Sequence, residues 1–279
     1  MKIAIIGLGL IGGSMAKAIK ENTDHTVYGY DLSDTVQKKA KLINAIDEPL
    51  TDELLRDCDL TIVALYPQAA IDYIRDKQEL FKKGSIVLDC CGVKQAVCSQ
   101  AEPIALKQGF VFIGGHPMAG LEHSGFDHAE KALFKNASMI LTPTKGNIQD
   151  VEKVKDLFTS IGFTNLQIAT PREHDQMIAF TSQLAHVVSS AYIKSPAAMK
   201  HKGFSAGSYR DLTRVAKLNE NMWTELFLDN PDFLAEEIDG IADRLKEYSR
   251  AIREKDAQTL RTLLKDGREK KAIIDGEVF

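Results

Sequence analysis

Short apolar runs alternate with amphipathic stretches through the first 170 residues of the chain. The apolar runs are rich in β-branched residues, and the segments between them show helical spacing of apolar positions. The runs expected to form strands are Ile3–Ile6, Val27–Tyr30, Leu60–Leu65, Ser85–Asp89, Phe110–Ile113, Met139–Thr142 and Asn165–Ala169. The segments expected to form helices are Ser14–Lys20, Gln68–Phe81, Gln95–Lys107 and Asn147–Ile161. This alternation predicts a doubly wound, mostly parallel sheet covered by helices on both faces.

The pattern changes near Pro171, a residue type that is favoured at the first position of a helix. Strand-like runs are absent from the sequence that follows. We therefore predict an α/β domain over residues 1–170 and an all-α domain over residues 171–279. One stripe in the second half repeats at intervals of 4, 3, 4, 3 and 4 residues: Leu234, Ile238, Ile241, Leu245, Tyr248 and Ile252. Such a helix either packs inside a bundle or is buried in a dimer.

A glycine motif directly follows the first apolar run. Gly7, Gly9 and Gly12 form G-x-G-x-x-G between a predicted strand and a predicted helix. In this context the glycines permit a tight turn, close approach of the backbone to a pyrophosphate, and close helix–strand packing. The helix N-terminus adds unpaired N–H groups and a positive dipole end. The motif predicts a Rossmann-type dinucleotide-binding domain, and the alternative is a glycine turn in a non-binding α/β domain.

Asp31 ends the second apolar run, 19 residues after Gly12. A carboxylate there can accept hydrogen bonds from both ribose hydroxyls and would repel a 2′-phosphate. The nearest cations that follow it are Lys38 and Lys39 rather than an arginine, so we predict NAD rather than NADP. Ligands of such sheets bind beyond the carboxyl ends of the strands. The residues expected to bind the cofactor are Gly7, Gly9, Leu10, Ile11, Gly12, Asp31, Leu65 and Pro67.

Composition excludes several classes of protein. The chain has 279 residues and a formal net charge of −4, which points to neither a nucleic-acid nor a membrane partner. No apolar run approaches the roughly 20 residues needed to span a bilayer. The four cysteines, Cys58, Cys90, Cys91 and Cys98, form no C-x-x-C pair, so we expect free thiols and no metal site. With no leader segment expected before the first strand, these features predict a soluble, cytoplasmic protein.

His116 is the candidate for acid–base chemistry. It lies between a strand end and Pro117 in the segment G-G-H-P-M-A-G, at the predicted crevice. The ordinary pKa of histidine, about 6.5, lets it accept a proton from a substrate hydroxyl near neutral pH.

Together with further motifs, the two glycine-containing segments resemble the prephenate/arogenate dehydrogenase family of tyrosine biosynthesis. The resemblance extends nearly end to end. Its motifs are G-L-G-L-I-G-G-S at 7–14, G-G-H-P-M-A-G at 114–120, His174-Asp175, T-S-Q-L-A-H at 181–186, Y-R-D-L-T-R-V-A at 209–216 and Met222-Trp223.

The resemblance implies an oxidative decarboxylation with NAD. The substrate, prephenate or arogenate, would lose a hydride from C4 and its ring carboxylate as CO2, and the ring would become aromatic. The resemblance assigns His116 to the 4-hydroxyl and Arg214 to a substrate carboxylate, a pairing that suits the planar guanidinium. It also assigns further substrate-pocket positions: His186, Ser182, Asp211 and Glu122. Asp211 could instead cap a helix, and Glu122 could be a surface acid.

The sequence departs from the family pattern at three positions. Many members carry D-x-x-S-x-K after a central strand, whereas this chain has Gly92 in place of the serine. Cys90, Cys91, Lys94 or a water would compensate, or the hydrogen bond is absent. Gln183 stands where a basic residue is frequent, and Ala185 stands where a proline is usual.

Two other functions stay open at this point. A related two-domain hydroxy-acid dehydrogenase would use a catalytic lysine in the helical half, but Lys194 and Lys217 lack that sequence context. A non-catalytic dinucleotide-binding protein would not need His116 and Arg214. The sequence does not discriminate prephenate from arogenate, and it favours a homodimer through the helical half.

Overall fold

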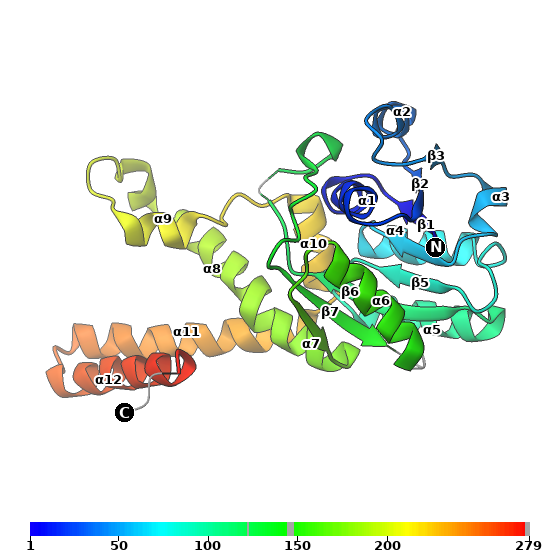
Figure 1. The fold of residues 1–279 in the computed structure, drawn as a ribbon. Helices are drawn as coiled ribbons and strands as arrows, with labels where there is room; N and C mark the ends of the chain where they lie inside the picture. The colour runs from blue at the N-terminus through cyan, green and yellow to red at the C-terminus, as the bar shows by residue number, and fades with distance from the viewer. Residues whose placement is uncertain (122, 144–147, 277–279) are drawn as a thin grey trace. The chain divides into compact units, whose positions relative to one another are not determined.

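The structure is a computed structural model that describes residues 1–121, 123–143 and 148–276 (Figure 1). It contains two compact units, Met1–Pro231 and Asp232–Phe279. The first unit holds an eight-stranded sheet and the helices around it, and the second is a pair of helices.

The sheet has the strand order β3-β2-β1-β4-β5-β6-β7-β8. Every neighbouring pair is parallel except β6 and β7, which are antiparallel. The predicted doubly wound, mostly parallel sheet is therefore confirmed. The strands are β1 (Lys2–Ile6), β2 (Thr26–Tyr30), β3 (Glu48–Pro49), β4 (Leu60–Val63), β5 (Ile86–Asp89), β6 (Val111–Pro117), β7 (Ser138–Pro143) and β8 (Asn165–Ile168).

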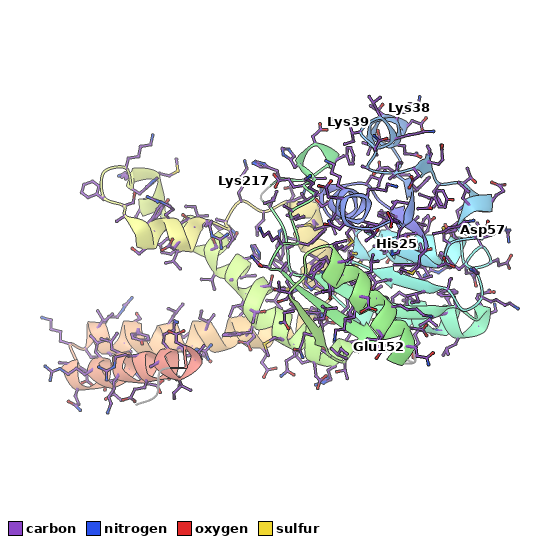
Figure 2. All side chains as sticks on the ribbon, viewed as in Figure 1. His25, Lys38, Lys39, Asp57, Glu152 and Lys217 are labelled. Carbon is purple, nitrogen blue, oxygen red and sulfur yellow. The ribbon has the colours of Figure 1, made fainter. Side chains whose placement is uncertain are left out.

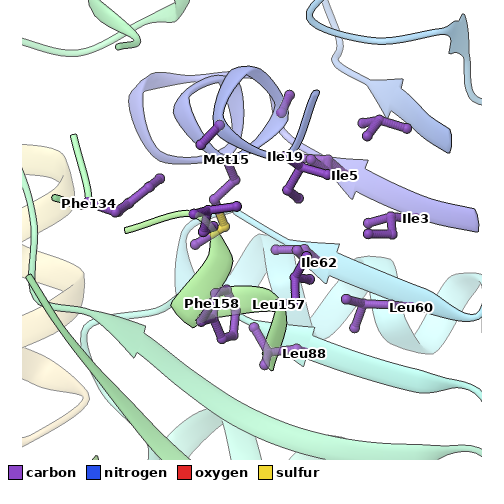
Figure 3. Close-up of a cluster of buried hydrophobic side chains, with 14 of the residues drawn as sticks. Ile3, Ile5, Met15, Ile19, Leu60, Ile62, Leu88, Phe134, Leu157 and Phe158 are labelled. Carbon is purple, nitrogen blue, oxygen red and sulfur yellow. The ribbon is translucent and has the colours of Figure 1, made fainter. Parts of the chain in front are cut away.

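Alternate residues of the strands enter two separate cores. On β1, Ile3 and Ile5 face one core, which α1 and α6 cover, whereas Ala4 and Ile6 face the other, which α4 and α5 cover. Figure 3 shows Ile3 and Ile5 on the same side of β1, with Met15 of α1 and Phe158 of α6 in the same cluster. Burial on both faces explains why the strands lack polar alternation. The helices of this half are α1 (Leu10–Asn22), α2 (Asp34–Leu42), α3 (Asp52–Leu55), α4 (Pro67–Asp76), α5 (Gln95–Gln108), η1 (Phe126–His128) and α6 (Ile148–Ser160).

The chain after β8 is helical throughout its described part, as the sequence predicts. Thr170 and Glu173 form a capping box at the start of α7, with Pro171 in the first turn. The helix continues through a π-helical segment, η2, into α8 without a break. The elements are α7 (Pro171–Ile178), η2 (Ala179–Gln183), α8 (Leu184–Ile193), η3 (Pro196–Lys200), α9 (Gly207–Thr213), α10 (Glu220–Leu228), α11 (Pro231–Arg253) and α12 (Ala257–Ile274). Among the described residues, no helix is long and apolar enough to cross a membrane.

The second unit consists of most of α11 together with α12. Asp256 caps α12, and the Tyr248 hydroxyl donates to the carbonyl of Leu263 at 3.2 Å, so the two helices pack on each other. The predicted stripe on α11 is only partly covered, because Leu245 and Ile252 are each 60% exposed.

The turn from β1 to α1 depends on two glycines. Gly7 has a φ of +86°, and a Cβ added there would lie 2.5 Å from the carbonyl oxygen of Ala64. A Cβ at Gly12 would lie 1.9 Å from the carbonyl oxygen of Gly7. A Cβ at Gly9, in contrast, would meet no atom within 4 Å. Gly7 and Gly12 therefore close the turn, whereas Gly9 leaves an open surface beside it.

The contrast between Gly12 and Gly9 is testable. Gly12→Ala forces a methyl group into a backbone carbonyl, so it should lower the free energy of unfolding by at least about 2 kcal/mol. Gly9→Ala, the matched control, should leave that free energy close to the wild-type value. Urea unfolding of both variants measures the difference, and equal stabilities would contradict the packing described for the turn.

Candidate active site

The residues expected to bind a cofactor lie together at the carboxyl edge of the sheet. Leu10 and Ile11 begin α1, and Pro67 begins α4 directly after β4. The Leu65 side chain packs beside Gly7. The open surface at Gly9 and the N-terminus of α1 fit a pyrophosphate, because the first N–H groups of a helix have no intrahelical partner and are available to an anion.

Asp31 supports the same loop from the end of β2. One carboxylate oxygen accepts from the backbone N–H of Leu8 at 2.9 Å, and the other accepts from that of Ser33 at 2.9 Å. An ionised carboxylate has about four acceptor sites, so Asp31 keeps capacity for ribose hydroxyls. Figure 2 labels Lys38 and Lys39 on neighbouring α2. Lys39 pairs with Asp127.

His116 lies inside a strand, which is longer than the sequence predicts. The expected strand ends at Ile113, but β6 continues to Pro117 because it pairs with antiparallel β7, where His116 is opposite Ile140. This pairing fixes the backbone of the half-buried histidine. Its Nε2 faces position 92, since a Cβ added at Gly92 would lie 3.8 Å from Nε2. The same Cβ would lie 3.4 Å from Leu226 Cδ2.

A second histidine and an aspartate extend inward from His116. His116 Nδ1 lies 2.9 Å from His174 Nε2, and His174 Nδ1 lies 2.7 Å from Asp175 Oδ1. The buried carboxylate of Asp175 also accepts from the backbone N–H groups of Lys94 at 2.7 Å and Gln95 at 2.8 Å. Those two groups form the N-terminus of α5, where a negative charge is favoured by the helix dipole.

A buried ion pair holds the residue before His116. The side chains of Asp89 and Lys94 are both fully buried and pair directly. Lys94 Nζ also donates to the carbonyl of Gly115 at 2.6 Å, and the N–H of Gly115 donates to Asp89 at 3.1 Å. Two side chains thus bind both backbone groups of Gly115 and fix the strand at the site.

The surroundings keep both histidines neutral. Burial lowers the pKa of His116 well below its ordinary value, and the positive charges of His174, when protonated, and of Lys94 lower it further. Burial also lowers the pKa of His174, although its hydrogen bond to Asp175 opposes this effect. At neutral pH, His116 is therefore a free base.

The helical half brings a second group of predicted residues together. His186 on α8 donates from Nδ1 to the carbonyl of Val215 at 3.3 Å, and its ring lies 4.0 Å from that of Trp223. Burial lowers the pKa of His186, and the charge of nearby Arg214 lowers it further. Arg214 itself is exposed, directly after α9.

The remaining predicted pocket residues differ in their placement. Ser182 is half-buried in the π-helical segment η2, and Asp211 is exposed on α9, near Arg214 in sequence. Glu122 lies outside the described residues. Helix α10 links the two groups, because Leu226 contacts the Gly92 position and Trp223, three residues earlier, contacts His186.

Three side chains were candidates to replace the serine hydroxyl that is absent at Gly92, and the structure shows what each of them contacts. Cys90 contacts Met15, Cys91 donates to the carbonyl of Leu65, and Lys94 binds Asp89 and Gly115. Each of these three side chains is engaged elsewhere. Within the described part of the chain, the polar partner found for the His116 ring is His174.

Gln183 has a structural position rather than one on a pocket wall. It is buried, donates to the carbonyl of Leu226 at 2.9 Å and accepts from Asn230 at 2.8 Å. Asn230 also donates to the carbonyl of Asp175 at 2.9 Å. A neutral amide at 183 therefore joins α10 to the helix that holds Asp175.

The comparisons with known proteins agree with this geometry. The family model described as "Prephenate dehydrogenase, nucleotide-binding domain" matches residues 15–165. The model described as "Prephenate dehydrogenase, dimerization domain" matches residues 170–266. The chain belongs to the prephenate dehydrogenase family. The family resemblance and the nucleotide-binding fold expected from the sequence are confirmed.

Relatives in this family carry three related names. A cyclohexadienyl dehydrogenase of Zymomonas mobilis is 32% identical over 269 residues, which cover 92% of this chain and 90% of the relative. A crystal structure of prephenate dehydrogenase from A. aeolicus, in complex with hydroxyphenyl propionate and NAD+, has a TM-score of 0.87 at 26% identity and covers 98% of both chains. Arogenate dehydrogenase of Synechocystis has a TM-score of 0.83 at 27% identity, with 98% of this chain and 100% of that chain covered.

The buried Asp89–Lys94 pair next to His116 should contribute more to the free energy of unfolding than an exposed ion pair of the same domain. Lys94→Met leaves the Asp89 carboxylate buried without its cation, which should cost about 3–5 kcal/mol. Lys82→Met removes an exposed pair with Asp59 and should cost under about 1 kcal/mol. Denaturant unfolding of the two variants tests this, and a Lys94→Met variant as stable as Lys82→Met would contradict it.

Proposed function

We propose that this chain catalyses the NAD-dependent oxidative decarboxylation of prephenate, of arogenate or of both. Family membership, the cofactor edge around Gly9 and Asp31, and neutral His116 at that edge support the proposal. When bound, NAD accepts the hydride. The observation that supports the proposed reaction most strongly is the position of His116, a free base fixed at the carboxyl edge of the sheet.

His116 removes the proton of the substrate hydroxyl. The O–H bond breaks and the proton moves to Nε2, so the oxygen lone pair can form a C=O bond as the C4 hydride leaves. The bond between the ring and its carboxylate then breaks, CO2 departs, and its electron pair makes the ring aromatic and leaves a phenolate oxygen. That oxygen takes the proton back from His116 Nε2, which yields the phenol and restores the free base. The chain contributes the base and, through the strand that carries it, a fixed orientation of that base.

Arg214 binds a substrate carboxylate in this proposal. Its guanidinium suits a bidentate pair with a planar carboxylate, and its exposure leaves it available to a ligand. Ser182, His186, Asp211 and Glu122 complete the proposed substrate pocket. Because His186 donates from Nδ1 to a backbone carbonyl, its Nε2 can accept a hydrogen bond from the substrate.

We also propose that residues 171–279 form a helical substrate-binding half that dimerises. The matched dimerization-domain description supports this, as do the apolar side chains exposed on it, Phe204 at 93% and Met199 at 89% among them. A homodimer and a cytoplasmic location belong to the proposal. Lys194 and Lys217, which an alternative hydroxy-acid dehydrogenase would use, are both exposed.

A substrate and cofactor matrix tests the activity. Purified protein is assayed for NADH or NADPH formation with prephenate and with arogenate, each with NAD and with NADP. We expect CO2 and NADH in equal amounts with at least one substrate. Absence of turnover with both substrates would refute the proposed function.

His116→Asn should lower kcat by about 10²-fold or more, the usual scale for loss of a general base. NAD binding should persist, because the cofactor edge is untouched. In the wild type, kcat/KM should fall only as pH drops through the lowered pKa of His116, hence below about pH 6.5, where the imidazole becomes charged. Unchanged turnover of His116→Asn would show that another group is the base.

Arg214→Ala should raise KM by about tenfold or more, since a hydrogen bond to a charged group contributes about 1.5–3 kcal/mol. Arg210→Ala, which removes an exposed arginine from the neighbouring helix α9, is the matched control and should leave KM unchanged. Steady-state kinetics with the better substrate measures both. An unchanged KM in Arg214→Ala would exclude the carboxylate-binding role.

A further inference from the structure

The hydrogen-bond chain behind His116 has a defined direction. Asp175 is a carboxylate that already accepts two backbone N–H groups of α5, so it can only accept from His174. His174 therefore has its proton on Nδ1 and an unprotonated Nε2. That Nε2 must accept from His116, which places the His116 proton on Nδ1 and leaves the lone pair on Nε2.

We propose that His174 and Asp175 are positioning residues that hold His116 in the Nδ1–H tautomer, so that its Nε2 is the base. The kinetic part rests on the proposed function. During proton transfer, the substrate O–H bond breaks and an N–H bond forms at Nε2. The new positive charge on His116 is then stabilised by the neutral acceptor His174 and, through it, by the Asp175 carboxylate.

Because residue 92 is a glycine, the hydrogen bond between His116 Nδ1 and His174 Nε2 is the main contact that orients the His116 ring. A hydroxyl there could reach Nε2, because a Cβ at Gly92 would lie 3.8 Å from that atom and meet nothing closer than 3.4 Å. Glycine offers no such partner. Nε2 thus has no side-chain hydroxyl at position 92 competing for its lone pair, and orientation depends on the Nδ1 side.

The charged groups around His116 and His174 favour two neutral rings joined by a hydrogen bond over a pair of rings that gain and lose charge near neutral pH. The charged or titratable groups that face the two rings are Asp175 on α7, Lys94 before α5 and Asp89 on β5. Asp89 and Lys94 neutralise each other. The Asp175 carboxylate is held by an α5 N-terminus, which fixes its position independently of substrate.

The tautomer can be measured without turnover. Ring-nitrogen NMR of the full chain at neutral pH should show a protonated Nδ1 and an unprotonated Nε2 for both His116 and His174. His174→Leu should remove this preference at His116, whereas His25→Leu, at the opposite edge of the sheet, should preserve it. A His116 ring protonated on Nε2 in the wild type would overturn the proposal, whatever the substrate of the enzyme.

Kinetics of two further variants separates positioning from general damage. His174→Leu should lower kcat about 10- to 100-fold, the scale for loss of an outer orienting partner, with KM and NAD binding close to wild type. His174→Gln keeps an acceptor near Nδ1 and should recover part of kcat.

Gly92→Ser provides an independent test. A serine hydroxyl that donates to Nε2 occupies the lone pair that receives the substrate proton, so Gly92→Ser should have a lower kcat than the wild type, while ring-nitrogen NMR should still show a protonated Nδ1 on His116. An unchanged kcat in His174→Leu, or a loss that appears only in KM, would overturn the relay. If the wild type turns over neither substrate, the proposed function fails, and the NMR result alone decides the tautomer.

Discussion

The Asp175 carboxylate is the contact on which the rest of the site depends. It accepts two backbone N–H groups from the start of α5 and one hydrogen bond from His174. The same side chain therefore caps a helix of the sheet domain, joins that helix to α7, and sets the direction of the hydrogen bonds behind His116. A buried carboxylate without these donors would destabilise the folded state. The same three hydrogen bonds therefore stabilise the fold and hold the histidine chain in place.

The sheet supplies the other fixed parts of the site. Antiparallel pairing of β6 with β7 extends the strand to His116, and the Asp89–Lys94 pair binds both backbone groups of Gly115. Across the same carboxyl edge, the turn at Gly7 and Gly12 closes tightly and leaves Gly9 open. The proposed function places the dinucleotide at that turn and assigns the proton transfer to His116.

The sequence predicted the parts that rest on local patterns. The apolar runs predicted the sheet, and the glycine motif with Asp31 predicted the cofactor edge. The segment G-G-H-P-M-A-G singled out His116 as the candidate base. The sequence did not predict β3, whose two residues include a proline and form no apolar run. The π-helical segment at Ser182 and the extension of β6 depend on neighbouring elements. The sequence did not indicate a positioning role for His174 and Asp175. Asp175 accepts hydrogen bonds from Lys94 and Gln95 at the start of α5, and these residues lie some 80 positions away along the chain. The signal available in the sequence was the adjacent His174-Asp175 pair, three residues after the predicted helix start at Pro171.

The most direct measurement of the central claim is a crystal structure of this chain with NAD+ and a hydroxyphenyl propionate. Its phenolic hydroxyl stands for the 4-hydroxyl of the substrate, and its carboxylate stands for that of the side chain. The account predicts a hydroxyl oxygen within about 3 Å of His116 Nε2, a carboxylate on Arg214, and His174 still bound to Nδ1. A ligand whose hydroxyl binds elsewhere, with His116 Nε2 turned toward protein, would contradict it.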